Sequence, residues 1–174
     1  LRQARLRLFL SQISNCNKPV NILDVGGSTF YWEHLFFSME GVNKQDFTIT
    51  ITNIDENQMK KQLSNDSYYK FVQADARKMS QFSNGEFEIV HSNSVIEHVG
   101  KFEDKMRMAL EVRRVGKHHF IQTPNFYFPV EPHFQAVFFH WLPRWLRVLL
   151  TRIFSLGHFP RAKNKQHAEE IVDS

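Results

Sequence analysis

The sequence predicts an α/β fold: an open, doubly wound, mostly parallel sheet flanked by helices. Two observations carry this prediction. Runs of β-branched and aromatic residues alternate with helix-like stretches up to about residue 123, and three of these runs end on or beside an aspartate. Such stretches connect parallel strands through right-handed crossovers, which place a ligand at the carboxyl ends of the strands.

The predicted elements follow one another in a regular order. An amphipathic helix over 2–14 opens the chain, because Leu6, Phe9 and Ile13 recur at helical spacing before Pro19. Apolar or alternating runs that stop at glycine, asparagine or proline indicate strands. We therefore expect strands over 21–26, 47–55, 69–75, 87–93 and 118–123, and helices over 30–39, 56–63 and 102–115.

Length and composition suit a single domain over 1–174. Of the 174 residues 42% are hydrophobic, so the chain can bury a core without metals or disulfides. We expect a ligand-binding core over 21–127 and a covering, substrate-side helical segment over 128–160.

The segment 134–156 is rich in apolar and aromatic residues. Arg144, Arg147 and Arg152 lie among its tryptophan, phenylalanine and leucine residues, a composition that suits a lipid headgroup boundary or a partner. We interpret the segment as a helix that covers the domain. Contact with a membrane surface or a partner is the alternative.

Charge and cysteine content argue against several classes of protein. The 22 lysines and arginines outnumber the 18 acidic residues only slightly, so we interpret the basic patches as solvated surface and expect no nucleic-acid partner. The single cysteine, Cys16, forms no internal disulfide and suits a reducing compartment such as the cytoplasm. The nine histidines include no pair four residues apart, which argues against a metal site. No apolar run reaches the roughly 18 residues of a membrane span.

Three strand ends carry residues that suit a nucleoside. In Asp24-Val25-Gly26-Gly27-Ser28, small residues let the backbone approach a ligand, and the helix that follows offers free amides. Asp55 ends the second strand, where a carboxylate accepts hydrogen bonds from both hydroxyls of a ribose. Asp75 ends the third strand, where a carboxylate accepts one from the exocyclic amine of adenine. The alternative for each aspartate is a cap on the following helix.

Four segments of the chain occur in an order that is typical of one family. They are Ile22-Leu23-Asp24-Val25-Gly26-Gly27, Asn53-Ile54-Asp55, Gln73-Ala74-Asp75-Ala76 and the stretch from Phe87 to Val99. This order resembles the class I S-adenosylmethionine-dependent methyltransferases, most closely the branch of ubiquinone-biosynthesis-type and other small-molecule methyltransferases. The resemblance covers about 21–133, and the segments 111–115 and 123–125 support it.

The resemblance implies a Rossmann-like methyltransferase fold, S-adenosyl-L-methionine as cofactor, and a small-molecule, lipid-precursor or sugar-type acceptor. It implies that the first loop lies against the methionine part of the cofactor, that Asp55 holds the ribose, and that Asp75 and Ala76 flank the adenine. The cofactor-binding residues that it implies are Asp24, Gly26, Gly27, Ser28, Asp55, Asp75, Ala76 and, at the methyl-donor end, Ser92 and Asn93.

The sequence departs from the family in three places. Ser28 and Phe30 replace later glycines of the first loop, and Lys117-His118-His119 replaces a glycine-rich turn. Between residues 157 and 174 nothing indicates the sixth and seventh strands with which family members complete their sheet. We therefore expect a truncated chain that lacks the C-terminal strands.

Four side chains are candidates for contact with the acceptor. Methyl transfer needs alignment of the acceptor and, for a hydroxyl or an acid, one base. His98 follows the fourth strand, and histidine is the residue type most often used as a base in catalysis, so His98 is the candidate base. A capping or packing histidine is the alternative. Glu97 is either a helix-start residue or a substrate contact. Glu131 and His133 either face the acceptor or belong to a proline-rich turn.

Two other classes of function fit the predicted sheet. A nicotinamide-dependent oxidoreductase shares the acidic end of the second strand, but residues 26–31 do not supply its Gly-x-Gly-x-x-Gly sequence. A non-catalytic module would keep the fold and use the basic, aromatic C-terminal part for binding.

Overall fold

The computed structural model describes residues 2–55, 57, 68–125, 130–131 and 134–173. The chain forms two compact units, Leu1–Thr123 and Pro124–Ser174. Apart from Asn57, the helix predicted over 56–63 lies outside the described residues.

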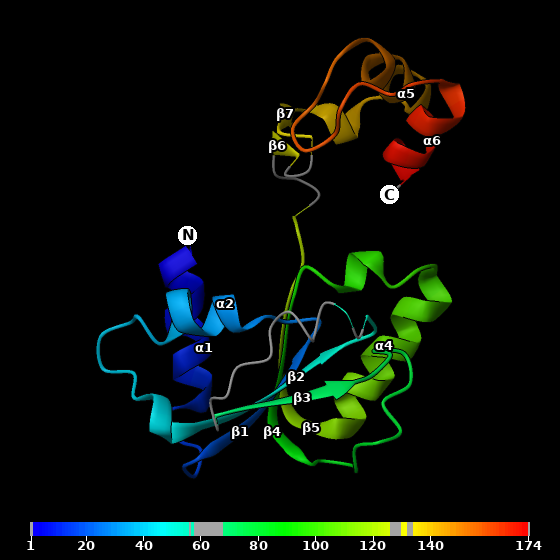
Figure 1. The fold of residues 1–174 in the computed structure, drawn as a ribbon. Helices are drawn as coiled ribbons and strands as arrows, with labels where there is room; N and C mark the ends of the chain where they lie inside the picture. The colour runs from blue at the N-terminus through cyan, green and yellow to red at the C-terminus, as the bar shows by residue number, and fades with distance from the viewer. Residues whose placement is uncertain (1, 56, 58–67, 126–129, 132–133, 174) are drawn as a thin grey trace. The chain divides into compact units, whose positions relative to one another are not determined.

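The first unit is built on a five-stranded, fully parallel sheet (Figure 1). Its strands lie in the order β3-β2-β1-β4-β5, which confirms the predicted doubly wound α/β fold. The order reverses between β1 and β4, and ligands of open α/β sheets bind at such a switch point. The strands are β1 (Val20–Val25), β2 (Phe47–Asn53), β3 (Tyr69–Gln73), β4 (Phe87–Asn93) and β5 (Gly116–Gln122).

Helix α1 (Arg2–Ile13) and a helical segment after β1 cover one face of the sheet. The segment begins as α2 (Thr29–Tyr31) and continues as a π-helix over Trp32–Phe36. The helix predicted over 30–39 therefore forms with a wider winding than an α-helix. A short 3-10 helix, Lys44–Asp46, leads into β2.

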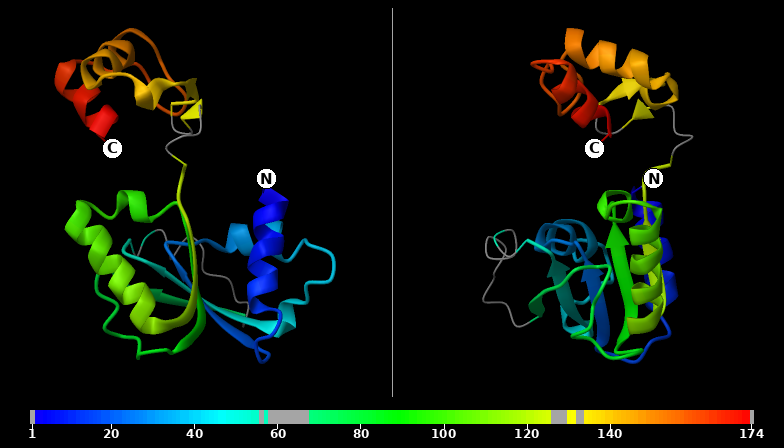
Figure 2. Two further views of the ribbon diagram at one scale, coloured as in Figure 1. Left: turned by 180° about the vertical axis from the view of Figure 1, so that it is seen from behind. Right: turned by 90° about the vertical axis from the view of Figure 1, so that its right-hand side faces the viewer.

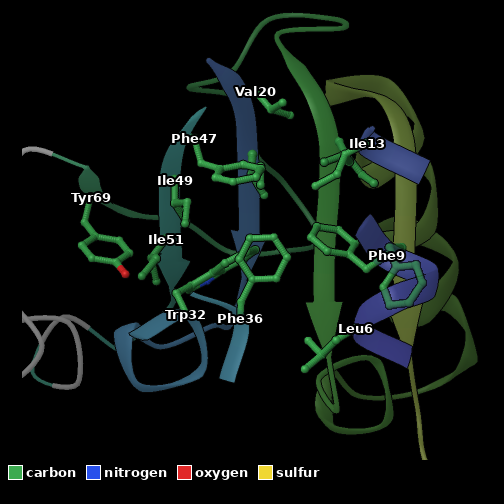
Figure 3. Packing of buried hydrophobic residues seen from close by; sticks show 13 residues of the cluster. Leu6, Phe9, Ile13, Val20, Trp32, Phe36, Phe47, Ile49, Ile51 and Tyr69 are labelled. Carbon is green, nitrogen blue, oxygen red and sulfur yellow. The ribbon is translucent and has the colours of Figure 1, made fainter. Parts of the chain in front are cut away.

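An aromatic layer between α1 and the sheet forms the core on this face (Figure 3). Phe9 of α1 is fully buried, and its ring packs edge-on against those of Trp32, Phe36 and Phe120 at centroid distances of 6.1, 5.4 and 5.2 Å. A fully buried side chain of this size contributes about 1.5–3 kcal/mol through the hydrophobic effect. The aromatic residues thus fix α1 and the π-helix on the sheet.

Helix α4 (Phe102–Val115) packs against a second cluster of apolar side chains, which includes Leu23 and Val25 of β1 (Figure 2). Its buried residues, Met108, Val112 and Val115, recur at helical spacing and face this cluster. The helix has the bounds that the sequence predicts.

Helix α4 also holds the loop that follows β3. Arg114 donates hydrogen bonds to the carboxylate of Glu111, at 2.7 and 2.9 Å, and to the backbone oxygens of Met79 and Phe82, both at 2.8 Å. Glu111 Oε2 in turn accepts a hydrogen bond of 2.6 Å from the amide of Met79. The pair therefore anchors a loop that begins at the end of β3, where Asp75 lies.

The second unit has a small core of its own. Phe134 stacks on Phe139 at 4.2 Å, and Arg144 Nη2 forms an ion pair of 2.6 Å with Asp173. The core also contains buried residues from both helices, including Val148 and Ala168. The elements are β6 (Val130–Glu131), β7 (Ala136–Val137), a 3-10 helix (Phe139–Trp141), α5 (Arg144–Ile153) and α6 (Lys165–Asp173).

Helix α5 carries an exposed apolar stripe. Trp145, Leu149 and Ile153 follow one another at four-residue spacing and are 68%, 43% and 50% exposed. The helix expected within 128–160 is present, but whether it covers the sheet or contacts a membrane or a partner stays a prediction. So does the division into a core over 21–127 and a covering segment.

We expect Glu111→Gln to lower the free energy of unfolding by about 1–2 kcal/mol at neutral pH, because hydrogen bonds to a charged group contribute roughly 1.5–3 kcal/mol. The hydrogen bonds from Arg114 lower the pKa of Glu111. The carboxylate therefore stabilises the fold above the pKa that it has in the unfolded chain, and this stabilisation is lost as the pH falls through the lower folded value. Urea unfolding near pH 7 and near pH 3 measures both effects.

The matched control is Glu103→Gln, which removes an exposed carboxylate from the same helix. Its free energy of unfolding should stay close to that of the parent at both pH values. Equal losses in the two variants, or a loss in Glu111→Gln that persists in acid, would contradict the role of the pair.

Candidate active site

Two cavities open at the carboxyl edge of the sheet. The first has a volume of about 330 Å³ and is lined by residues at the ends of β1, β2 and β3 and by the turn after β4. The second has a volume of about 270 Å³ and is lined by α1, the helical segment after β1 and the ends of β4 and β5. Ser94 lines the second cavity and Val95 the first, so the two cavities meet at the chain just beyond β4.

Gly26 follows β1 and forms part of the wall of the first cavity. Its φ of +69° lies in the left-handed region, and a Cβ at this position would approach Val95 Cγ2 to 2.6 Å. Its amide donates a hydrogen bond of 2.7 Å to the oxygen of Thr52. Backbone conformation and close approach therefore both require glycine here.

Asp24 lies behind this wall, with its side chain 1% exposed. Trp32 Nε1 donates a hydrogen bond of 2.7 Å to Oδ2, and His91 Nδ1 lies 2.8 Å from Oδ1. A Cβ on Gly27 would overlap this carboxylate. The sequence alone does not identify Trp32 and His91 as partners of Asp24.

Ser92 is also buried within the sheet, where its hydroxyl donates a hydrogen bond of 3.1 Å to the oxygen of Val25. The side chains of Asp24 and Ser92 thus hold β1, β4 and the π-helix together. Their predicted contacts with a cofactor stay predictions.

Asp55 follows Asn53 and Ile54, which line the first cavity at the end of β2. Its Oδ1 accepts a hydrogen bond of 2.8 Å from the amide of Asn57, and its own amide donates one of 3.0 Å to Asn53 Oδ1. The carboxylate is half-buried. The bond to Asn57 is of the kind that a cap makes, but the helix that Asp55 would cap lies, apart from Asn57, outside the described residues. This bond leaves the predicted contact with a ribose untested.

Asp75 and Ala76 line the first cavity at the end of β3, together with Arg77. Arg77 Nε and Nη2 donate hydrogen bonds of 2.9 and 2.7 Å to the two carboxylate oxygens of Asp75. These bonds lower the pKa of Asp75, which is therefore ionised at neutral pH. Arg77 Nη1 also lies 3.5 Å from Asp104 of α4. Sequence reasoning missed Arg77, although its position two residues after Asp75 is a signal for such a local pair.

Asn93 lies apart from these residues, at the exposed end of β4, where it lines the second cavity. Ser94 follows with a φ of 57°, a left-handed conformation that serine rarely adopts. The amide of Ser94 donates a hydrogen bond of 2.9 Å to the oxygen of Gln122. Strand β5 therefore holds the chain in this conformation between the two cavities. Ser28, at the N-terminus of α2, is half-buried.

His98 lies on a 3-10 turn, Ile96–His98, where its exposed side chain lines the first cavity. Glu97 lies on the same turn, and its Oε2 accepts a hydrogen bond of 3.2 Å from the hydroxyl of Thr123. Glu131 belongs to β6 of the second unit, and His133 lies outside the described residues. The roles expected for these four residues stay predictions.

A family model described as a methyltransferase domain matches residues 1–165. The chain belongs to this methyltransferase family. A search of curated proteins finds no significant match to it.

Solved structures of other methyltransferases share the fold of this family member. One is a candidate S-adenosyl-L-methionine-dependent methyltransferase from Methanococcus maripaludis, at 14% identity and a TM-score of 0.51, covering 67% of this chain and 52% of that chain. A candidate methyltransferase from an antibiotic biosynthesis pathway of Anabaena variabilis has 15% identity and a TM-score of 0.54, covering 86% and 61%. A candidate sarcosine dimethylglycine methyltransferase from Galdieria sulphuraria has 16% identity and a TM-score of 0.50, covering 64% and 41%. This chain thus covers between 41% and 61% of the length of these three proteins.

A cluster of metal-binding side chains and a membrane-spanning helix are both absent from the described part of this methyltransferase-family chain. There, no three histidine, cysteine or acidic side chains gather in a way that could hold a metal ion. Within the same ranges, no helix is both long and apolar enough to cross a membrane.

We expect Gly27→Ala to lower the free energy of unfolding of the first unit by at least about 2–3 kcal/mol, because the new methyl group must displace the buried Asp24 carboxylate. In a background with Trp141 and Trp145 replaced by phenylalanine, Trp32 is the single tryptophan and reports on the first unit. Its fluorescence during urea unfolding measures the loss.

Gly41→Ala is the control. Gly41 has a φ of +81° but open space around it, so alanine should cost only the roughly 1–2 kcal/mol of a left-handed residue. A smaller loss for Gly27→Ala than for Gly41→Ala would mean that the contact between Gly27 and Asp24 does not constrain the loop.

Proposed function

We propose that the chain binds S-adenosyl-L-methionine in the first cavity and transfers its methyl group to a small-molecule acceptor, which includes lipid precursors and sugar-type metabolites. One observation carries the proposal. In a chain of a methyltransferase family, a cavity of about 330 Å³ lies at the carboxyl ends of β1, β2 and β3. Its volume falls within the ~300–1,000 Å³ of small-molecule sites.

The lining of the first cavity suits the nucleoside and methionine parts of this cofactor. Gly26 lines the cavity at the end of β1, and its missing side chain leaves room for Val95, which lines the same cavity. In the proposed complex the methionine part lies along the loop 26–28. Asp55 accepts hydrogen bonds from the ribose hydroxyls, and Asp75 and Ala76 flank the adenine.

Arg77 changes what Asp75 can do in this complex. The two side chains form several hydrogen bonds with each other, which use much of the acceptor capacity of the Asp75 carboxylate. We therefore infer that Asp75 and Arg77 act together as a rigid, internally neutralised wall beside the adenine. Shape and stacking then contribute more to adenine binding than a hydrogen bond to Asp75.

Methyl transfer requires few catalytic groups from the protein. Bound S-adenosyl-L-methionine would supply a methyl group on a positively charged sulfur. A lone pair of the acceptor forms the new bond to the methyl carbon, and the electron pair of the broken carbon–sulfur bond stays on sulfur. Any proton that the acceptor loses passes to a base or to water. The chain aligns the two molecules and excludes water. His98, whose side chain lines the first cavity, is the proposed base, and packing beside the cofactor is its alternative role.

We expect calorimetric titration to show micromolar binding of S-adenosylhomocysteine, the demethylated product, to the intact chain. Asp55→Ala should weaken binding at least about tenfold, because two hydrogen bonds to a charged carboxylate are lost. Asp55→Asn should also weaken it while keeping an acceptor for the amide of Asn57, which separates loss of binding from loss of the local turn.

The control for this titration is Asp46→Ala. Asp46 precedes the amino end of β2, whereas Asp55 follows its carboxyl end, and Asp46 pairs with Lys18; neither Asp46 nor Lys18 lines the cavity. This variant should bind like the parent. A folded parent chain that binds no S-adenosylhomocysteine would refute the proposal. Binding with no turnover on any acceptor would favour a non-catalytic module.

A further inference from the structure

The second cavity combines an aromatic wall with a polar rim and one cation. Phe30 and Tyr31 come from α2, and Leu6 and Leu35 add apolar surface. The rim consists of polar side chains at the ends of β4 and β5, namely Asn93, Ser94 and Gln122. Among the described residues that line this cavity, Arg5 of α1 is the only charged one.

Arg5 belongs to a stretch of the sequence that contains no acidic residue. The first 23 residues of the sequence contain no aspartate or glutamate, and α1 carries three arginines. In the described part of the chain, no carboxylate lies within ion-pair distance of Arg5, and its side chain is exposed. The guanidinium is thus available for an anion, and its planar fork suits a carboxylate or a phosphate.

The aromatic wall is uncharged at neutral pH. The ring of Tyr31 lies 4.8 Å from that of the buried His91. Burial and the nearby Asp24 carboxylate raise the pKa of Tyr31 to about 12. The phenol therefore stays protonated and does not repel an anion in the cavity.

Two adjacent residues of the chain line different cavities. Ser94 lines one and Val95 the other, and the left-handed Ser94 is held by its hydrogen bond to Gln122. Strained backbone of this kind is concentrated at functional sites. A molecule in the second cavity would therefore lie next to the chain that bounds the first.

We propose that the second cavity binds the methyl acceptor, that this acceptor carries a carboxylate or phosphate group, and that Arg5 binds the anion. The inference rests on the proposed function, because it identifies the acceptor side of the same site. Phe30 and Tyr31 pack against the body of the acceptor, and Asn93 and Gln122 orient its polar groups. Arg5 is thus a specificity-determining residue.

Fragment titrations of the intact ¹⁵N-labelled chain, with and without saturating S-adenosylhomocysteine, test the inference. Benzoate and phenyl phosphate are the anionic probes, and benzamide is the neutral probe of the same shape. We expect both anions to shift the amide signals of Ser94 and Gln122 and to bind at least about tenfold more tightly than benzamide. Arg5→Gln should abolish this preference and leave the affinity for benzamide within about twofold of the parent value.

Arg7→Gln is the matched control, because Arg7 is an exposed arginine on the same helix that does not line the cavity. It should retain the preference for anions. Equal binding of benzoate and benzamide by the parent, no shift at Ser94 with either anion, or equal effects of the two arginine variants would overturn the inference. Failure of the proposed function is distinguishable, since S-adenosylhomocysteine would then not bind while the fragments still report on the second cavity.

Discussion

The buried carboxylate of Asp24 is the interaction on which the rest of the first unit depends. A buried carboxylate is costly unless its oxygens accept hydrogen bonds, and Asp24 has one partner on each oxygen. Trp32 belongs to the π-helix and His91 to β4, so this one side chain joins three elements. Gly27 lies against the same carboxylate, which leaves no room for a side chain at position 27. The loop after β1 is thereby fixed before any ligand arrives.

The same network explains why two cavities form at the switch point. The hydroxyl of Ser92 bonds to Val25 across β4 and β1, and the amide of Gly26 bonds to Thr52 across β1 and β2. These bonds close the sheet directly beneath the loop. Above it, Gly26 approaches Val95, which follows the left-handed Ser94. The chain at Ser94 and Val95, where the two cavities meet, is therefore held by three neighbouring strands.

Local patterns in the sequence predict most of the sheet but not the network beneath the loop. The strand 87–93 and the helix 102–115 have the predicted bounds, because a turn signal at Asn84 and Gly85 and regular apolar spacing mark them. The partners of Asp24 lie 8 and 67 residues away, and no local pattern identifies a contact over such distances. The sequence does not indicate helix α6, because the stretch is polar and only a few small or apolar residues, such as Ala168 and Ile171, form the buried face of the helix.

The candidate site shows the same division between local and long-range information. The sequence predicts where the strands end, and the residues that follow two of these ends, Asp75, Ala76 and His98, line one cavity. Arg5 lies some ninety residues before the end of β4 in sequence, and only the packing of Phe9 and its neighbours on α1 brings that helix to the second cavity. The two cavities consequently differ in charge. Asp75 and Arg77 neutralise each other in the first, whereas the described residues that line the second include no acidic counterpart of Arg5. Under the proposed function this difference favours an acceptor whose anionic group lies in the second cavity, beside Ser94 and Val95 where the two cavities meet.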